Sequence, residues 1–387
     1  MEFFLDILRG IAKMRNPVFD FFFQAITYCG DEIVFMAIAM FLFWCVSKKE
    51  GYYILTVGFV GTILNQFLKI TFRILRPWDL DPSIGVVGNA KEAATGYSFP
   101  SGHTQNSVGT FGGIAYVFKK KWVRITCIAL CILVPFSRMY LGVHTPLDVI
   151  VSVVIAIALI FAIRPIFYKA YESTRGIVIF ISVMVLMAIA FVLYLELYNF
   201  PPEVHKVLED GMTPLEHSLK NAYTLLGALL GMAVALPIER KYINFETKDK
   251  WYIQIIKTVL GLAIVLGVKE ISKALLKPIF GNNQGIQAVR YFAVVMVAVC
   301  AYPLLFPIFR KIDEKIIAVV EHDQVMNVYN DISELPKHML EEMQHFFRVY
   351  KQLEGKATYI EKVENVDIAK NIIEDSIENY KNKFTTK

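Results

Sequence analysis

The first half of the chain contains three short strings whose side chains suit phosphate chemistry. They are Lys69-x6-Arg76-Pro77, Pro100-Ser101-Gly102-His103 and Ser137-Arg138-x5-His144-x3-Asp148. Together they supply cations and backbone amides that hold a phosphate, and histidines that attack phosphorus or carry a proton. The strings therefore predict a site that moves a phosphoryl group onto a histidine.

The first string places two cations near the end of an apolar segment. Lys69 and Arg76 are seven residues apart, which is about two helical turns, so both are expected on one face of a helix that Pro77 helps to terminate. Two cations that face one spot suit a phosphate dianion. The alternative is a pair whose long side chains hold the helix end at the lipid headgroups.

The second string predicts a helix start that binds anions. Ser101 is a plausible N-cap, and Gly102 permits close approach to the backbone. Free amides at a helix start, with the positive end of the helix dipole behind them, bind phosphate oxygens. His103 would then stand beside the phosphate in the first helical turn.

The third string combines a phosphate-binding group with a paired histidine and carboxylate. Arg138 offers a planar fork of donors. Thr145 as N-cap, Pro146 at the first helical position and Asp148 in the first turn predict a helix start from which Asp148 reaches back to His144. A carboxylate on one ring nitrogen fixes the tautomer and leaves the other nitrogen to attack phosphorus. A single histidine near a helix start is more often only a cap or a surface group.

In order and spacing, the three strings resemble the signature of type 2 phosphatidic acid phosphatases, a superfamily that includes bacterial acid phosphatases and vanadium haloperoxidases. The resemblance implies that His144 is the nucleophile that forms a phosphohistidine, that Asp148 orients it and that His103 protonates the leaving group. It assigns the phosphoryl oxygens to Lys69, Arg76, Ser101, Gly102 and Arg138. Because these groups supply the positive charge, we expect no metal and no other cofactor.

Composition predicts an all-α polytopic membrane protein. Hydrophobic residues make up 55% of the chain and charged residues only 19%. Because a bilayer core requires about 20 apolar helical residues, we expect about ten membrane segments. A six-helix phosphatase core is expected within residues 1–170 and about four further transmembrane helices within 171–310. Residues 3–14 resemble an amphipathic interfacial helix rather than a cleavable signal peptide. The apolar runs cover roughly residues 17–28, 31–46, 51–75, 103–118, 122–142, 146–166, 176–198, 217–237, 251–268 and 286–309.

Basic residues predict the orientation of these segments. Cytoplasmic connections carry an excess of Lys and Arg, and basic clusters occupy alternate connections, at 48–49, 119–124, 164–175, 240–250 and 310–311. The other connections, which carry the three strings, would then face the non-cytoplasmic side of the cell membrane. Lys269, Lys273 and Lys277 lie on the predicted outer side and argue against this topology.

The second half of the membrane region carries no comparable set of catalytic residues. Glu196, His205 and His217 lie near the predicted outer face, where they would line a substrate entrance. The simpler interpretation is that they are polar residues at the interface without a role in the chemistry.

Residues 311–387 differ sharply in composition and predict a small, soluble, α-rich cytoplasmic tail. Apolar spacing predicts amphipathic helices over 334–353 and 367–384, with a short extended stretch at 356–363. From about residue 313 the tail resembles the C-terminal part of family I inorganic pyrophosphatases, and Tyr350-Lys351 matches a phosphate-contacting pair of that family. The metal-binding carboxylates that precede this part in the family are missing, so we expect no pyrophosphatase activity. A natural fusion and an artificial joining remain equally open.

The leading function is an integral membrane phosphatase of a lipid phosphate or a polyprenyl diphosphate. Three alternatives remain: a phosphatase of a soluble ester, as in glucose-6-phosphatase-like relatives; a membrane protein that binds or transports phosphate without turnover; and a functional tail with a membrane anchor. The expected partners are the bilayer and a lipid phosphate substrate, with no nucleic acid. The five cysteines show no metal-binding spacing, and we expect no disulfide. The sequence gives no prediction of oligomeric state.

Overall fold

The computed structural model consists of two units, residues 1–309 and 310–387. It describes residues 1–91, 94, 96–208, 211–281, 283–309, 315–319, 323–350, 360 and 362–384. Within these ranges all regular secondary structure is helical and no strand occurs. The fold is therefore that of an all-α polytopic membrane protein, as the composition predicts.

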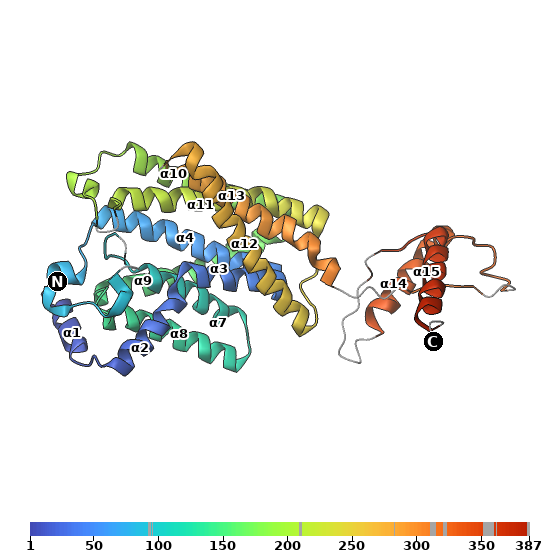
Figure 1. Ribbon diagram of the computed structural model, residues 1–387, viewed down its shortest axis with the longest axis horizontal. Coiled ribbons are helices and arrows are strands. Elements are labelled where there is room, and N and C mark those ends of the chain that lie inside the picture. The colour runs from blue at the N-terminus through green and yellow to red at the C-terminus, as the bar shows by residue number, and fades with distance from the viewer. Residues whose placement is uncertain are drawn as a thin grey trace. The chain divides into compact units, whose positions relative to one another are not determined.

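The membrane unit is a bundle of helices joined by short connections (Figure 1). Its α-helices are α1 Glu2–Ala12, α2 Pro17–Thr27, α3 Glu32–Phe41, α4 Lys48–Phe72, α5 Pro77–Leu80, α6 Gly102–Ser107, α7 Gly113–Val117, α8 Lys121–Tyr140, α9 Pro146–Tyr171, α10 Thr174–Leu197, α11 Pro214–Ile238, α12 Trp251–Phe280 and α13 Ile286–Met296. Short π-helical or 3-10 turns extend several of them, such as η1 Tyr28–Gly30, η5 Val108–Gly112 and η8 Val297–Ala301.

All ten apolar runs of the sequence are helical, but not all are long enough to cross a bilayer. Seven helical segments among the described residues are long and apolar enough, and α2 with α3 forms an eighth candidate that is bent by 55°. The continuous helical run 102–117, formed by α6, η5 and α7, spans only about 24 Å at 1.5 Å per residue. The count of seven or eight spans is thus lower than the ten segments expected. The runs at 17–28 and 31–46 form one bent span, and the run at 103–118 is too short to count.

Helix α4 occupies the centre of the bundle. It packs against α9 on one side and against α11 on the other, so it lies between the first-half helices and the α10, α11 and α13 layer (Figure 1). Close contact in this layer requires small residues: a Cβ at Gly227 of α11 would lie 2.1 Å from the Ala288 carbonyl oxygen. The second-half helices are therefore packed directly onto the helix that carries Lys69.

Helix α1 covers one end of the first-half bundle. Leu5 and Leu8 are buried against Ile84, whereas Phe3 is exposed. The amphipathic helix expected at 3–14 is therefore present at Glu2–Ala12, with one apolar side on the protein. Its place at a membrane interface stays a prediction.

A buried ion pair joins the two halves of the membrane unit at the end away from the three strings. Lys48 Nζ, at the start of α4, lies 2.6 Å from Glu239 Oε1, just after α11, and the Glu239 side chain is fully buried. Lys48 also donates to Asn244 Oδ1 at 3.3 Å and lies over the Phe245 ring. A second pair, Lys257 with Asp249, lies in the same region of the chain.

The tail contains the two helices that the apolar spacing predicts. They are α14 Lys337–Val349 and α15 Val366–Phe384. The Asp331 carboxylate accepts a hydrogen bond from Val366 N at 2.7 Å and thereby ties the approach to α14 to the start of α15. Lys351 and most of the expected extended stretch lie outside the described residues.

The Lys48–Glu239 pair gives a test of how the halves are held together. Removing one partner of a buried pair leaves the other uncompensated, so Glu239→Ala should lower the free energy of unfolding by roughly 3 kcal/mol, the lower end of the range because Lys48 keeps Asn244. The apparent melting temperature in detergent measures this loss. Lys48→Met combined with Glu239→Leu should recover most of it, and no difference between the single and double variants would contradict the role of the pair.

Candidate active site

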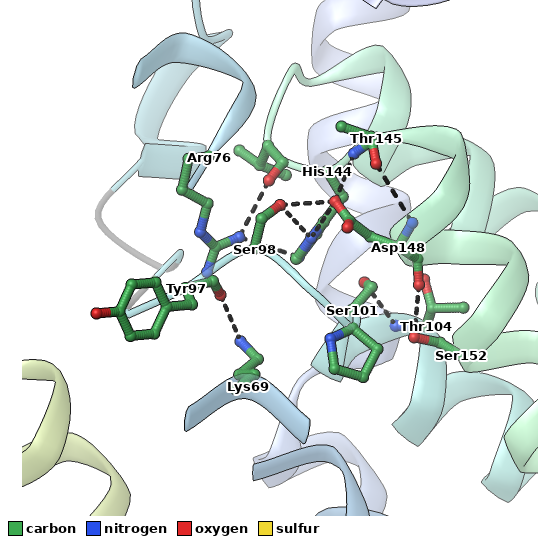
Figure 2. Close-up of polar contacts among 12 residues, drawn as sticks. Lys69, Arg76, Tyr97, Ser98, Ser101, Thr104, His144, Thr145, Asp148 and Ser152 are labelled. Carbon is green, nitrogen blue, oxygen red and sulfur yellow. Dashed lines mark hydrogen bonds and ion pairs between the residues drawn. The ribbon is translucent and has the colours of Figure 1, made fainter. Parts of the chain in front are cut away.

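The three strings meet around His144, in the connection between α8 and α9 (Figure 2). His144 is only 2% exposed, and Asp148 and Ser98 are completely buried. The His144 Nδ1 to Asp148 Oδ2 distance is 3.6 Å, too long for a hydrogen bond. Ser98 Oγ lies between them, 2.6 Å from Asp148 Oδ2 and 3.4 Å from His144 Nδ1. The two groups are thus within ion-pair distance, and the hydrogen-bonded link between them runs through the Ser98 hydroxyl.

The Asp148 carboxylate is held by the helix start that the sequence predicts. Thr145 is the N-cap of α9, and its side chain accepts from Asp148 N, while Asp148 Oδ2 accepts from Thr145 N at 2.7 Å. This reciprocal capping box fixes the carboxylate in the first turn. Asp148 Oδ2 also accepts from Ser98 Oγ. The start of α9 therefore fixes the carboxylate that Ser98 contacts.

Arg76 contacts the other nitrogen of the His144 ring. Arg76 Nη1 is 3.1 Å from His144 Nε2 and donates to Val143 O at 3.0 Å. A guanidinium is only a donor, so Nε2 must be the acceptor and the ring proton must reside on Nδ1. Nδ1–H faces Ser98, whose own hydroxyl proton is directed to Asp148. The network therefore selects the tautomer in which the ring lone pair is on Nε2, where it accepts from Arg76.

Lys69 and Arg76 are brought together differently from the sequence expectation. Helix α4 ends at Phe72, where Arg73 adopts a left-handed conformation with φ of 51°, and Arg76 follows as the N-cap of α5. The two cations therefore do not share a helix face, and Pro77 begins a helix instead of ending one. They meet through the 96–98 segment: Lys69 Nζ donates to Tyr97 O at 3.1 Å and Arg76 Nε to Gly96 O at 3.1 Å.

Arg138 has donors that no described residue satisfies. Its side chain is fully buried, Nη1 donates to Thr27 Oγ1 at 2.7 Å, and its Nε and Nη2 atoms have no partner within the described chain. Buried donors are costly to leave unpaired. The unpaired Nε and Nη2 donors of this planar guanidinium fit the oxygens of a phosphate, the ligand that the third string predicts.

The Pro100–His103 string begins a helix and leaves space above it. Ser101 is the N-cap of α6, and its hydroxyl accepts from Thr104 N at 3.4 Å. A Cβ at Gly102 would meet only Asn65 Oδ1, at 3.8 Å. Packing within the protein therefore does not require glycine here, which is consistent with space kept for a ligand close to the backbone.

His103 is paired with an acid that the sequence analysis did not identify. His103 Nε2 lies 2.7 Å from Asp31 Oδ1, a close ion-pair contact whose direction does not fit a hydrogen bond. Asp31 sits at the break between α2 and α3. Gly30 makes this approach possible, because a Cβ there would lie 2.9 Å from the His103 carbonyl oxygen.

The surroundings of His144 favour its neutral form. Burial lowers the pKa of His144 well below its ordinary value of 6.5, and the nearby charges of Arg76, Arg138 and Lys69 lower it further. A neutral imidazole with a lone pair on Nε2 is the form that a nucleophile requires. Charge and hydrogen bonding thus favour the same protonation state.

Sequence reasoning missed three residues that support the site: Ser98, Asp31 and Trp78. Ser98 lies two residues before the Pro100–His103 string, where no spacing rule marks it. Asp31 had a weak signal, a carboxylate at the break between two short apolar runs. Trp78 is of a residue type typical of the membrane interface, but its ring lies 5.7 Å from the Arg76 guanidinium, within cation–π range.

Three family models match the chain. A PAP2 superfamily model matches residues 50–172, a model of the transmembrane extension of PAP2 superfamily phosphatases matches 223–313, and an inorganic pyrophosphatase model matches 309–381. The first covers all three strings, and the last confirms the resemblance of the tail. No solved structure is significantly similar to this chain.

Curated relatives divide in the same way. A lipid A 4'-phosphatase of Porphyromonas gingivalis is 30% identical over 187 residues, 46% of this chain and 78% of the relative. A probable sphingosine-1-phosphate phosphatase of Dictyostelium discoideum is 29% identical over 171 residues, 41% of each chain. An inorganic pyrophosphatase of Halalkalibacterium halodurans is 41% identical over 69 residues, 18% of this chain and 42% of the relative.

The chain thus spans about two fifths of the length of two of these relatives, but more than three quarters of the bacterial lipid A phosphatase. The match to that phosphatase and the family models agree with the order of the three strings. The chain belongs to the PAP2 superfamily, with the transmembrane extension of that superfamily and a pyrophosphatase-like tail.

Proposed function

We propose that the protein is a membrane phosphatase that hydrolyses a lipid phosphate or polyprenyl diphosphate through a phosphohistidine on His144. The observation that carries this proposal is the set of contacts of one buried ring. Arg76 leaves His144 Nε2 as an acceptor, and Ser98 links Nδ1 to Asp148. A protein that only binds phosphate has no need of an oriented nucleophile.

In the first step, the Nε2 lone pair attacks phosphorus and the bond to the leaving oxygen breaks. His103 gives its proton to that oxygen. Burial and the charge of Arg138 lower the pKa of His103 to about 4 in the absence of phosphate, and Asp31 beside it and the negative charge of a bound phosphate favour the protonated ring. In the second step, water attacks the phosphohistidine and gives a proton to His103 while the P–N bond breaks. Inorganic phosphate leaves, and both histidines return to their starting states.

Arg76 has to change partners during this cycle. With no phosphate bound it contacts Nε2, the atom that attacks. A phosphate on Arg76, Arg138 and Lys69 would draw the guanidinium onto its oxygens and release Nε2. The Ser101 and Gly102 helix start supplies further donors. These fixed positive groups stabilise the charge on the equatorial oxygens during transfer.

The membrane location favours a lipid substrate, and the lipid A and sphingosine phosphate relatives support that choice. A soluble phosphate ester is the second candidate, since the same contacts would hold its phosphate. The non-cytoplasmic position of the site and the cytoplasmic position of the tail stay predictions. We assign no pyrophosphatase activity to the tail, because the metal-binding carboxylates that precede this part in pyrophosphatases are missing.

The nucleophile assignment is tested with His144→Ala in purified protein. Removing the attacking atom should reduce phosphate release from lipid phosphates by roughly a thousandfold or more. Labelled substrate should leave acid-labile phosphate on the native chain and none on the variant. His205→Ala, the same change at an exposed histidine of the membrane unit, is the matched control. Equal release by His144→Ala and the native chain would refute the proposal.

The pH dependence follows from the lowered pKa of His144. The neutral ring attacks, so activity should persist as pH falls below 6.5 and disappear only through the lowered pKa. We therefore expect no acid limb near pH 6.5 in kcat/KM, which reports the free enzyme. Phosphate monoesters titrate near pH 6 themselves, so the profile is measured with two lipids of different phosphate pKa. An acid limb at or above 6.5 that is the same for both lipids would contradict this.

Ser98 is tested as a positioning residue. Ser98→Ala breaks the link between Nδ1–H and Asp148 and should lower kcat roughly tenfold, with little change in KM because no phosphate contact is lost. Ser98→Thr keeps the hydroxyl and should recover most of the rate. A merely structural role would instead lower the amount of folded protein without changing the kcat of the folded fraction. That result, or a loss confined to KM, would remove Ser98 from the mechanism.

A further inference from the structure

A small cavity lies next to the candidate active site, between α4 and the first turns of α11. Its volume is about 20 Å³, which is room for one oxygen-sized group. Lys69 and Gln66 line it from α4, Tyr97 from the intervening loop, and His217, Ser218 and Asn221 from α11. Helix α11 therefore contributes three polar side chains directly beside a proposed phosphate-binding lysine.

The polar residues form two facing stripes. On α11, positions 214, 217, 218 and 221 are spaced so that they share one helix face, and on α4 positions 66 and 69 do the same. One to three turns further into the bundle the contact between these helices becomes apolar, with Ile63, Leu225 and Leu229 in one buried cluster. Polar side chains inside a membrane bundle commonly mark a ligand path.

The chemistry of the cavity suits an anion. Its side chains include an ammonium, an imidazole and two amides, and no described carboxylate lines it. The Ser218 hydroxyl, which also lines it, donates to Pro214 O at 3.0 Å. Glu216, the nearest acid along α11, is engaged in the capping box of that helix, where its Oε2 accepts from Thr213 N at 2.7 Å. Neither Gln66 nor Asn221 makes a side-chain hydrogen bond to another residue that the structure describes, so both amides remain available to a ligand.

The cavity and the nucleophile share one wall. Lys69, in the cavity, donates to Tyr97 O, and Arg76, on His144, donates to the preceding carbonyl, Gly96 O. Gly96 also lines the cavity. The 96–97 backbone therefore places the cavity beside the phosphate site that we propose at His144.

We propose that α11 and Lys69 form a second anion subsite, which binds an oxygen of the non-reacting phosphate when the substrate is a lipid diphosphate. This inference rests on the proposed function and narrows its substrate class. The terminal phosphate would be transferred to His144, and the inner phosphate would leave as a lipid monophosphate held by the cavity. The α11 side chains would then select diphosphates without taking part in the chemistry.

The test compares farnesyl diphosphate with farnesyl phosphate, which share one lipid chain, by initial rates of phosphate release. His217→Ala and Asn221→Ala should each lower kcat/KM for the diphosphate about tenfold and leave that for the monophosphate within about twofold. Lys220→Ala is the matched control: it removes an exposed cation next to Asn221 that lies outside the cavity lining, and should change neither substrate.

Several outcomes would overturn the subsite. Equal losses on both substrates would show a structural role for α11, and unchanged diphosphate kinetics would show no contact. Native protein that releases phosphate from the monophosphate alone would also refute it, whereas native protein that acts on neither substrate refutes the proposed function itself.

A second measurement does not depend on the variants folding. Methylenediphosphonate, which cannot be hydrolysed, should inhibit the native protein about tenfold more strongly than methylphosphonate. Equal inhibition by the two compounds would overturn the subsite even if His217→Ala and Asn221→Ala failed to fold.

Discussion

The contact between Arg76 and His144 is the interaction on which the rest of the site depends. A guanidinium cannot accept a hydrogen bond, so its approach to Nε2 determines where the ring proton resides. That proton then needs an acceptor on the opposite side of the ring, and Ser98 with Asp148 behind it provides one. The fold has to deliver Arg76 from the α4–α5 turn, Ser98 from the following loop and Asp148 from α9 to the two edges of one imidazole.

The same arrangement has an electrostatic cost that a substrate relieves. Lys69, Arg76 and Arg138 gather in a buried region, and two donor atoms of Arg138 lack a partner in the part of the chain that the structure describes. Uncompensated buried charge destabilises a fold. In the proposed function, a phosphate dianion would supply both the missing acceptors and the opposite charge. Its binding would then be favoured because the empty site is the less favourable state.

Local signals in the sequence were sufficient for the helix starts and insufficient for the contacts between them. Ser101 and Thr145 act as N-caps through contacts three positions away, Asp148 completes the capping box and Pro146 is the first helical residue, as the sequence predicts. The prediction that Lys69 and Arg76 share one helix face was wrong, because the helix ends at Phe72 and Arg73 turns the chain between them. The partners Ser98–Asp148 and Asp31–His103 are 50 and 72 residues apart, so only tertiary packing brings them together.

Helix α11 is connected to α4 at both ends, and the two connections differ in kind. At one end, Lys48 and Glu239 form a buried ion pair whose geometry fixes how α11 meets the start of α4. At the other end, α11 faces the Lys69 end of α4 across a polar cavity with unengaged amides. A rigid attachment at the far end sets the register of α11, and that register decides which of its side chains stand beside Lys69. Packing that looks purely structural can in this way determine which headgroups the site accepts.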